Sequence, residues 1–228
     1  MSMEERKKLD LRNWWDYHKW YVIFGLLFAI FLIRRVGFAV GLLGIKSDVE
    51  LAYVGSARLP EEAEGAIIQA FSSLAGDYNG DGRVEVSLHS YPSGLGEKDG
   101  QEGMAYAMGM EVALLGDIED CDSFFFLLED PVDFQLRYQM LSLPDGSVPD
   151  KRDVSPEGKG ALWKELPALA SQDLGLYEEN ILGKISLGDC QERLGELFVG
   201  RRYFEGEKTC KNLRECEELW NRIWEGKE

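Results

Sequence analysis

The segment DYNGDGRV, which begins at Asp77, has the residue types and spacing of the first half of a calcium-binding loop. Asp77, Asn79 and Asp81 offer side-chain oxygens at the first, third and fifth positions, and Arg83 offers its backbone carbonyl at the seventh. The twelfth position, where an EF-hand has a bidentate glutamate, is Leu88. The segment therefore predicts either a calcium site completed from elsewhere in the chain or an Asx and glycine turn that joins a helix to a strand.

Other residue types that commonly carry chemistry are scarce. The chain has two histidines, His18 and His89, which is too little material for a histidine-based zinc site or a Ser-His-Asp triad. The glycine-rich stretches lack the lysine and the spacing of a P-loop, and no serine stands in a G-x-S-x-G context. We therefore expect no catalytic residues and a non-enzymatic function.

The four cysteines show no C-x-x-C spacing, so a structural zinc site is a weak hypothesis. An even number of cysteines in an exported domain predicts disulfide bonds instead. Cys210 and Cys216 are close enough in sequence to close a small loop, and Cys121 with Cys190 would form the other pair.

An apolar segment covers residues 20–45 and is interrupted only by Arg34 and Arg35. Its unbroken part, 20–33, would reach about 21 Å as a helix, which is short of a bilayer core. We expect the span to continue past the arginines, because their side chains can snorkel to the headgroups. The sequence thus predicts three parts: a cytoplasmic segment (1–19), a transmembrane helix (20–45) and an extracytoplasmic domain (46–228).

Two alternatives compete with a retained anchor. A cleaved signal peptide is disfavoured, because the apolar run begins late and no small-x-small site follows near Ile33. An amphipathic helix packed on the soluble domain would also use the cluster NWWDYHKWY, but such a cluster before an apolar run is typical of an interfacial aromatic belt. Five basic residues precede the span and three lie at or beyond its end, so we expect the N-terminus in the cytoplasm.

Charge is distributed unevenly along the chain. Residues 1–45 carry seven basic and four acidic side chains, whereas the rest carries 18 basic and 37 acidic ones, a net charge of −19. Such an acidic body repels phosphate backbones and anionic lipids, which argues against nucleic acid as a partner. The acidity keeps a surface domain soluble and leaves cations and basic partners as candidates.

After residue 46, short strands alternate with helical stretches, which is typical of an α/β domain with a mixed or parallel sheet. The predicted strands are 49–55, 83–91, 123–128 and 196–204. The span 161–189 is ambiguous and is interpreted as a helical turn followed by a short strand at 185–187. The predicted helices are 60–74, 101–115, 131–140 and 212–224, with a loop over 143–160. An apolar stripe on the last helix should pack on the body of the domain and consists of Leu213, Cys216, Trp220, Ile223 and Trp224.

The chain resembles a family of uncharacterised single-pass membrane proteins of Gram-positive anaerobic bacteria in the segments WWDYHKWYVIFGLLFAIFLI, DVELAYVG, DYNGDGRVEV, FFFLLEDP and FVGRRYFEGEKTC. The order of elements up to SFFFLLEDP is also similar to the first lobe of the extracytoplasmic solute-binding proteins of ABC transporters, but the chain leaves no room for a second lobe. This likeness implies a ligand surface at the carboxyl ends of the strands, in the loops Gly55–Leu59, Tyr91–Gly96 and Glu129–Pro131.

These patterns favour a membrane-anchored extracytoplasmic binding or interaction module without enzymatic activity, held in the lipid bilayer by its N-terminal helix. Its expected partner is a transporter or envelope protein. The alternative is a cell-surface protein whose fold calcium stabilises. An envelope hydrolase built on carboxylates ranks third, because no nucleophile, base or metal constellation accompanies them.

Overall fold

The computed structural model describes residues 18–20, 28, 47–93, 100–150, 153–181, 184–204 and 209–226. The chain divides into two compact units, Met1–Lys46 and Ser47–Glu228. The predicted transmembrane helix, 20–45, lies outside the described residues except for Trp20 and Phe28, which are helical. Within the described ranges, no helix combines the length and the apolar character that crossing a bilayer requires.

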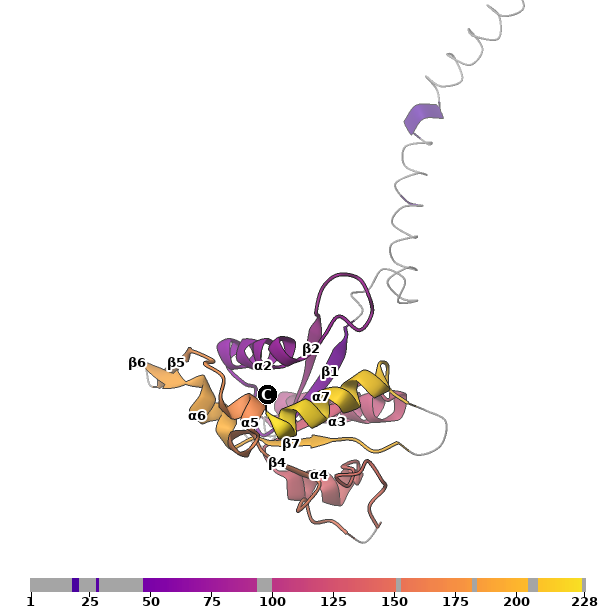
Figure 1. Cartoon of the computed structure of the whole chain (residues 1–228). Helices are drawn as coiled ribbons and strands as arrows, with labels where there is room; N and C mark the ends of the chain where they lie inside the picture. The colour runs from indigo at the N-terminus through magenta and orange to yellow at the C-terminus, as the bar shows by residue number, and fades with distance from the viewer. Residues whose placement is uncertain are drawn as a thin grey trace, which may run out of the picture. The chain divides into compact units, whose positions relative to one another are not determined.

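The second unit is an α/β domain built on a five-stranded mixed sheet (Figure 1). The strands are β1 (Val49–Gly55), β2 (Val86–Pro92), β3 (Phe125–Leu128), β4 (Gly160–Leu162) and β7 (Phe198–Arg201), in the spatial order β2-β1-β3-β7-β4. β1 pairs in parallel with both β2 and β3, whereas β7 is antiparallel to β3 and β4. A separate antiparallel hairpin consists of β5 (Leu176–Ile181) and β6 (Lys184–Asp189).

Helices cover both faces of the sheet. They are α2 (Glu61–Leu74), α3 (Gly100–Asp120), α4 (Pro131–Tyr138), the 3-10 turn η2 (Trp163–Glu165), α5 (Pro167–Ala170), α6 (Cys190–Gly195) and α7 (Leu213–Glu225). α2, η2, α5, α6 and α7 bury side chains against one face, which we call the packed face. α3 and α4 cover the opposite face, which we call the pocket face.

The packed face contains the main hydrophobic core. Phe125 of β3 lies at its centre, with ring centroids 5.2 Å from Phe71 and 6.1 Å from Trp220. Trp163 is fully buried beside Phe71. Because successive side chains of a strand point to opposite faces, Phe126 belongs to the smaller cluster under α3 and α4.

The predicted α/β class and the first six predicted elements of the domain are confirmed, with boundary shifts of a few residues except at the end of α3. α3 runs five residues beyond the predicted end at 115, to Asp120. The sequence pattern did not resolve β4, α6 or the full β5–β6 hairpin, because each is short and irregular in its apolar spacing. The stripe of α7 is buried as predicted except at its ends, where Trp224 is 41% exposed and Leu213 is half-buried.

Candidate functional site

The order of strands changes direction at β1. The chain first moves outward from β1 to β2 and then places β3 on the other side of β1, so that the carboxyl ends of β1 and β3 form a topological switch point. Open α/β sheets bind ligands at such a point, because the connections leave it toward opposite faces. Here α2 follows β1 on the packed face, and α3 precedes β3 on the pocket face.

A pocket of about 900 Å³ lies at this edge of the sheet, with α3 and α4 contributing to its walls. The three loops predicted to form the ligand surface all contribute to its lining. Gly55 and Ser56 come from the first loop, Ser93 from the second, and Glu129 and Asp130 from the third. Positions 94–96 of the second loop lie outside the described residues. We call this cavity the switch-point pocket.

Glu129 is held firmly at the end of β3. The Tyr53 hydroxyl donates to its Oε1 at 2.8 Å, and the Ser56 backbone N–H and hydroxyl both donate to its Oε2 at 2.7 Å. The Arg193 guanidinium lies 3.5 Å from Oε1. Burial alone would raise the pKa of Glu129, but the donors from Ser56 and Tyr53 outweigh it, and the pKa is lowered.

Gly55 lets the backbone of β1 pass beside this carboxylate. A Cβ atom at Gly55 would lie 2.2 Å from the Tyr53 hydroxyl oxygen and 2.9 Å from Cδ of Glu129. Glu129 also takes the Ser56 N–H, a backbone donor that an anionic ligand could otherwise use at the end of a parallel strand. The switch point therefore keeps a negative charge of its own, which disfavours an anionic ligand.

The remaining lining of the pocket combines charged and soft apolar side chains. The Arg137 guanidinium lies 2.9 Å from Asp133 and 3.8 Å from Glu111, and Asp130 caps α4 by accepting the N–H of Val132 and of Asp133. Thioethers and aromatic rings form the apolar part, namely Met104, Met108, Met110, Tyr91, Phe134 and Tyr138. Among the described lining residues, four carboxylates face one guanidinium, so the pocket is net negative.

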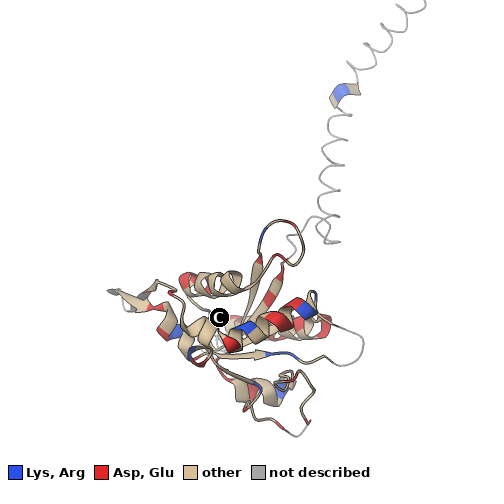
Figure 2. Cartoon of the chain, viewed as in Figure 1, with Lys and Arg blue, Asp and Glu red and all other residues tan. Residues whose placement is uncertain are grey.

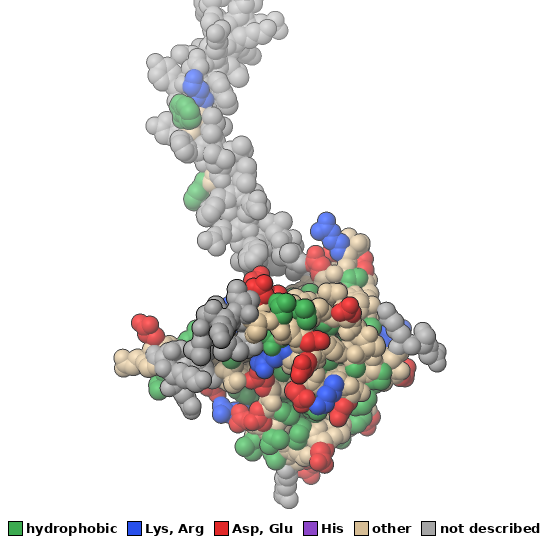
Figure 3. Space-filling model, turned by 90° about the vertical axis from the view of Figure 1, so that its left-hand side faces the viewer, with side chains coloured by type: hydrophobic (Ala, Val, Ile, Leu, Met, Phe, Trp, Pro, Cys, Tyr) green, Lys and Arg blue, Asp and Glu red, His purple; other side chains and the backbone are tan. Residues whose placement is uncertain are grey.

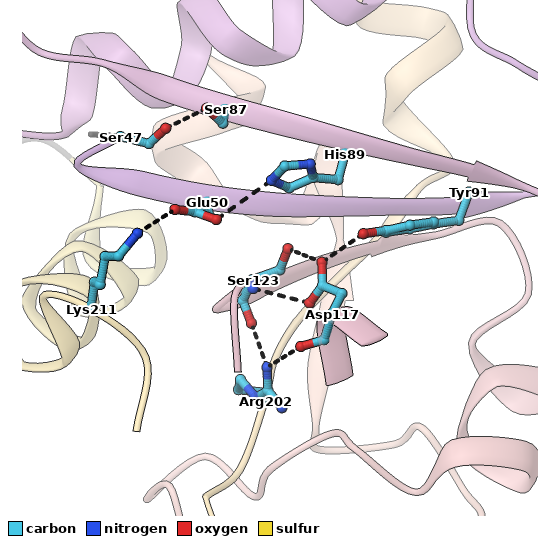
Figure 4. A network of polar contacts seen from close by, with 9 residues as sticks. All are labelled: Ser47, Glu50, Ser87, His89, Tyr91, Asp117, Ser123, Arg202 and Lys211. Atoms are coloured by element: carbon cyan, nitrogen blue, oxygen red, sulfur yellow. Dashed lines mark hydrogen bonds and ion pairs between the residues drawn. The ribbon is translucent and has the colours of Figure 1, made fainter. Parts of the chain in front are cut away.

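A buried polar network fixes α3 beside the pocket (Figure 4). Asp117 is 4% exposed and accepts the Tyr91 hydroxyl at 2.9 Å, the Ser123 N–H at 3.0 Å and the Ser123 hydroxyl at 2.6 Å. Arg202 donates to the carbonyl oxygens of Ser123 at 3.1 Å and Ile118 at 2.7 Å. Burial, with the charge of Asp117, raises the pKa of Tyr91, so its hydroxyl remains a donor.

His89, the one histidine of the second unit, lies on the pocket face of β2 and contacts a carboxylate (Figure 4). Its Nε2 is 3.5 Å from Oε2 of Glu50, whose Oε1 is 3.4 Å from Nζ of Lys211. The contact with Glu50 raises the pKa of His89, although burial alone would lower it. Burial alone would raise the pKa of Glu50, but His89 and Lys211 outweigh it, and that pKa is lowered. The hydroxyls drawn above this pair, those of Ser47 and Ser87, bond to each other. His89 thus has an ion-pair partner in Glu50.

The predicted calcium loop folds as a series of Asx turns. The Asp77 carboxylate accepts the N–H groups of Gly80, Asp81 and Gly82, Asn79 Oδ1 accepts the N–H of Asp81, and Asp81 accepts that of Arg83. Among the residues that the structure describes, no group of three or more His, Cys, Asp or Glu side chains is arranged to hold a metal ion. The hydrogen bonds match the turn interpretation, and calcium binding stays a prediction.

Asp48 holds this loop against the sheet. Its carboxylate is 2% exposed and accepts the N–H groups of Tyr78 at 2.8 Å, Asn79 at 2.9 Å and Glu85 at 2.8 Å. The sequence pattern did not identify Asp48, because the partners lie about 30 positions away and no local motif marks them. The same holds for Tyr53 and Arg193, which meet Glu129 only in the folded chain.

All four cysteines are free thiols in this structure. Cys210 and Cys216 lie in hydrogen-bond contact in the core of the packed face, and this contact lowers the pKa of Cys210 and, with burial, raises that of Cys216. The structure does not bring Cys121 and Cys190 together. Cys190 is buried on the packed face, whereas Cys121 comes directly after the end of α3, the helix that covers the pocket face. The first predicted disulfide pair is therefore juxtaposed and the second is not.

No family model, curated protein or solved structure matches the chain. The function is accordingly inferred from the geometry of the switch-point pocket and its surroundings.

Proposed function

We propose that this protein is a membrane-anchored extracytoplasmic binding module without enzymatic activity, and that its ligand occupies the switch-point pocket. The observation that carries the proposal is the convergence of three loops, each following a parallel strand, on one cavity of about 900 Å³. A cavity of that size is typical of small-molecule and side-chain recognition. The resemblance of the sequence to one lobe of a solute-binding protein, if it holds, supports a ligand at the same edge of the sheet.

The chemistry of the pocket supports a cationic ligand with an apolar body. Four carboxylates line it against one guanidinium, and Glu129 already occupies the donor that an anion would need. Methionine side chains adapt to irregular apolar shapes, and the faces of Tyr91 and Tyr138 can attract a cation. An organic ammonium or guanidinium compound, or a basic side chain of a partner protein, satisfies these features.

The polar groups of the pocket support binding rather than turnover. The Ser56 side chain lines the pocket, and its hydroxyl donates a hydrogen bond to Glu129. Because the pKa of Glu129 is lowered, this carboxylate is a weak base for activating a hydroxyl. Among the described lining residues there is no histidine, cysteine or lysine that could take the role of base or nucleophile.

The anchor and its orientation rest on the sequence. The apolar residues 20–45, the aromatic cluster before them and the basic N-terminal flank favour a retained span with the acidic domain outside the cytoplasm. Figure 2 shows acidic residues on helices of both faces, and Figure 3 shows apolar side chains scattered among charged ones on one side of the molecule. A distributed acidic surface suits a soluble domain facing an aqueous compartment.

The ligand class is tested by charge reversal in the full chain. Tetramethylammonium, choline and spermidine serve as probes in thermal-shift and calorimetric titrations. We expect at least one to bind the wild type, and Glu111→Lys to weaken binding about tenfold or more because a cation then meets a like charge. Asp120→Lys is the matched control, since it makes the same change of charge on the exposed end of α3.

Three results would contradict the proposal. One is preferential binding of an anion such as phosphate or citrate. Another is an equal loss of binding in Asp120→Lys, which would show a general charge effect. The third is turnover of an envelope substrate that His89→Ala abolishes, because a catalytic histidine is incompatible with a pure binding module.

The orientation has its own test. Glu157 is exposed, and Glu157→Cys in a Cys121→Ser background should react with a membrane-impermeant thiol reagent on intact cells. Labelling that appears only after lysis would place the domain in the cytoplasm.

A further inference from the structure

The two edges of the sheet differ in length and protection. β4 forms one edge with three residues, and β2 forms the other with seven. Natural sheets protect a long edge with lysines, an internal proline or a covering segment. β2 reads VSLHSYP, with no lysine, arginine or carboxylate, and its proline stands at the last position. Within the part of the chain that the structure describes, neither a charged side chain of β2, nor an internal proline, nor a paired strand protects this edge.

Alternation along β2 shows which backbone groups face outward. The Glu85 carbonyl accepts the N–H of Asp48, and the Ser93 N–H donates to the carbonyl of Gly55, so the odd-numbered residues face β1. The N–H and C=O groups of the even-numbered residues therefore point away from the sheet. Val86, Leu88 and Ser90 each offer both groups, and Pro92 offers only a carbonyl. Within the part of the chain that the structure describes, their outward groups have no backbone partner.

A groove runs beside this edge between α2 and α3. It has a volume of about 500 Å³, and its walls include Arg58 and Glu64 from the α2 side. On the α3 side, Tyr106, Met110 and Ala113 form an apolar stripe at helical spacing, and Tyr106 is 43% exposed. The groove therefore presents unpaired backbone groups next to an apolar helix surface, which is the arrangement that accepts an added strand.

We infer that β2 pairs with β2 of a second copy of this chain, forming a continuous ten-stranded sheet across a twofold axis at Leu88. In this antiparallel register Val86 lies opposite Ser90, and Leu88 lies opposite its own counterpart. Each outward-facing pair exchanges two hydrogen bonds, so every free N–H and C=O of the three residues is satisfied. The contact is isologous, because both copies use the same surface.

Charge favours a second copy as the occupant of the edge. The domain is strongly acidic, and most of its surfaces would repel their own copy. β2 is uncharged apart from His89, and the proposed register places His89 opposite Ser87 and Glu85 opposite Tyr91. No like charges face each other across the strands, which is the condition for stable cross-strand pairing. The partner that this edge fits is therefore the edge itself.

The test measures association and backbone protection in the full chain, purified in a non-ionic detergent. Light scattering over a wide concentration range should show a dimer. Hydrogen exchange should show that the amides of Val86, Leu88 and Ser90 are protected in the dimer and exchange quickly on dilution. The amides of Ser87 and His89, which face β1, should stay protected in both states.

Ser90→Pro removes one outward N–H and should weaken the dimer about tenfold or more, because proline is tolerated at an edge but cannot donate. Ser90→Ala is the matched control; it loses the side-chain bond to Glu64 and keeps the N–H, so its dimer should persist. If Ser90→Pro proves unstable, Tyr106→Glu serves instead. It adds a negative charge beside the edge in each copy, so the two copies should repel each other, and Tyr106 is too exposed for the change to disturb the core.

A chain that is monomeric at every concentration overturns the inference. So does a dimer that both Ser90→Pro and Tyr106→Glu leave unchanged, because its contact then lies elsewhere. A monomer whose Val86, Leu88 and Ser90 amides become protected only when an unrelated extended peptide is added also overturns it, and assigns the edge to a different partner.

Discussion

The packed face and the pocket face of one sheet are built for different purposes. Among the described residues, the packed face buries 27 apolar residues in one cluster and the pocket face buries seven. On the pocket face, α3 and α4 leave large apolar side chains exposed, including Met104, Met108, Val112 and Leu136. α3 is held instead by the polar network around Asp117. The packed face therefore contributes most of the stability, whereas the pocket face offers an adaptable surface.

Truncation of two neighbouring side chains in β3 should change the stability of the domain most. Phe125 and Phe126 are both fully buried, but Phe125 lies among the rings of the packed face and Phe126 lies near the pocket. We expect Phe125→Ala to lower the free energy of unfolding by about 4–5 kcal/mol and Phe126→Ala by about 3 kcal/mol, because the smaller cluster around Phe126 should relax more readily into the space left behind. Urea unfolding of the full chain measures both. A larger loss for Phe126→Ala would invert the comparison.

A smaller effect concerns the polar network that replaces packing under α3. Asp117→Ala leaves the Tyr91 hydroxyl and both donors of Ser123 without their acceptor. We expect a loss of about 2–3 kcal/mol, the usual range for buried donors left unsatisfied. The matched control is Asp120→Ala on the exposed end of the same helix, which should change stability by less than about 0.5 kcal/mol. Equal effects would show that apolar contacts hold α3.

The pH dependence of stability should expose the polar character of the pocket face. Glu50 raises the pKa of His89, so protonation of His89 stabilises the fold fully below its ordinary pKa of about 6.5. That contribution is lost as pH rises through the raised value. Because His89 is 43% exposed, we expect it to be at most about 1 kcal/mol.

Melting temperatures across the neutral range measure this contribution, and His89→Gln should flatten the profile. Glu50, the carboxylate that contacts His89, has a lowered pKa and therefore stays ionised across this range. If the melting temperature of the wild type does not change with pH across the neutral range, the contact with Glu50 does not stabilise the fold.

Calcium should have the smallest effect, and it would act at the loop that joins α2 of the packed face to the edge strand β2. If the loop binds the ion, millimolar calcium should stabilise the fold by under about 1 kcal/mol, as expected for a calcium site of weak affinity. Asp81→Ala should abolish the rise in melting temperature. Asp145→Ala is the control, because Asp145 supports a similar turn through Ser147 outside the predicted site. An unchanged wild-type transition would leave the turn interpretation alone.

Much of the fold is readable in the sequence because its signals are local. Alternation in 83–91 and the run SFFFLL predict strands, and Pro131 predicts the start of α4. The terminal helix is evident from its apolar spacing. The short elements after Gly160 are not readable in this way, because tertiary contacts rather than a periodic pattern determine them.

The class of the domain, its acidity and the three loops at the carboxyl ends of the strands can be read from the sequence alone. The fold was needed to show that Glu129 meets Tyr53 and Arg193, that β2 is an edge strand, and that Cys210 contacts Cys216 while Cys121 lies apart from Cys190. This difference follows from the range of the forces involved. Helix and strand periodicity act over a few residues, whereas ion pairs, strand order and thiol contacts join segments whose separation in sequence carries no pattern.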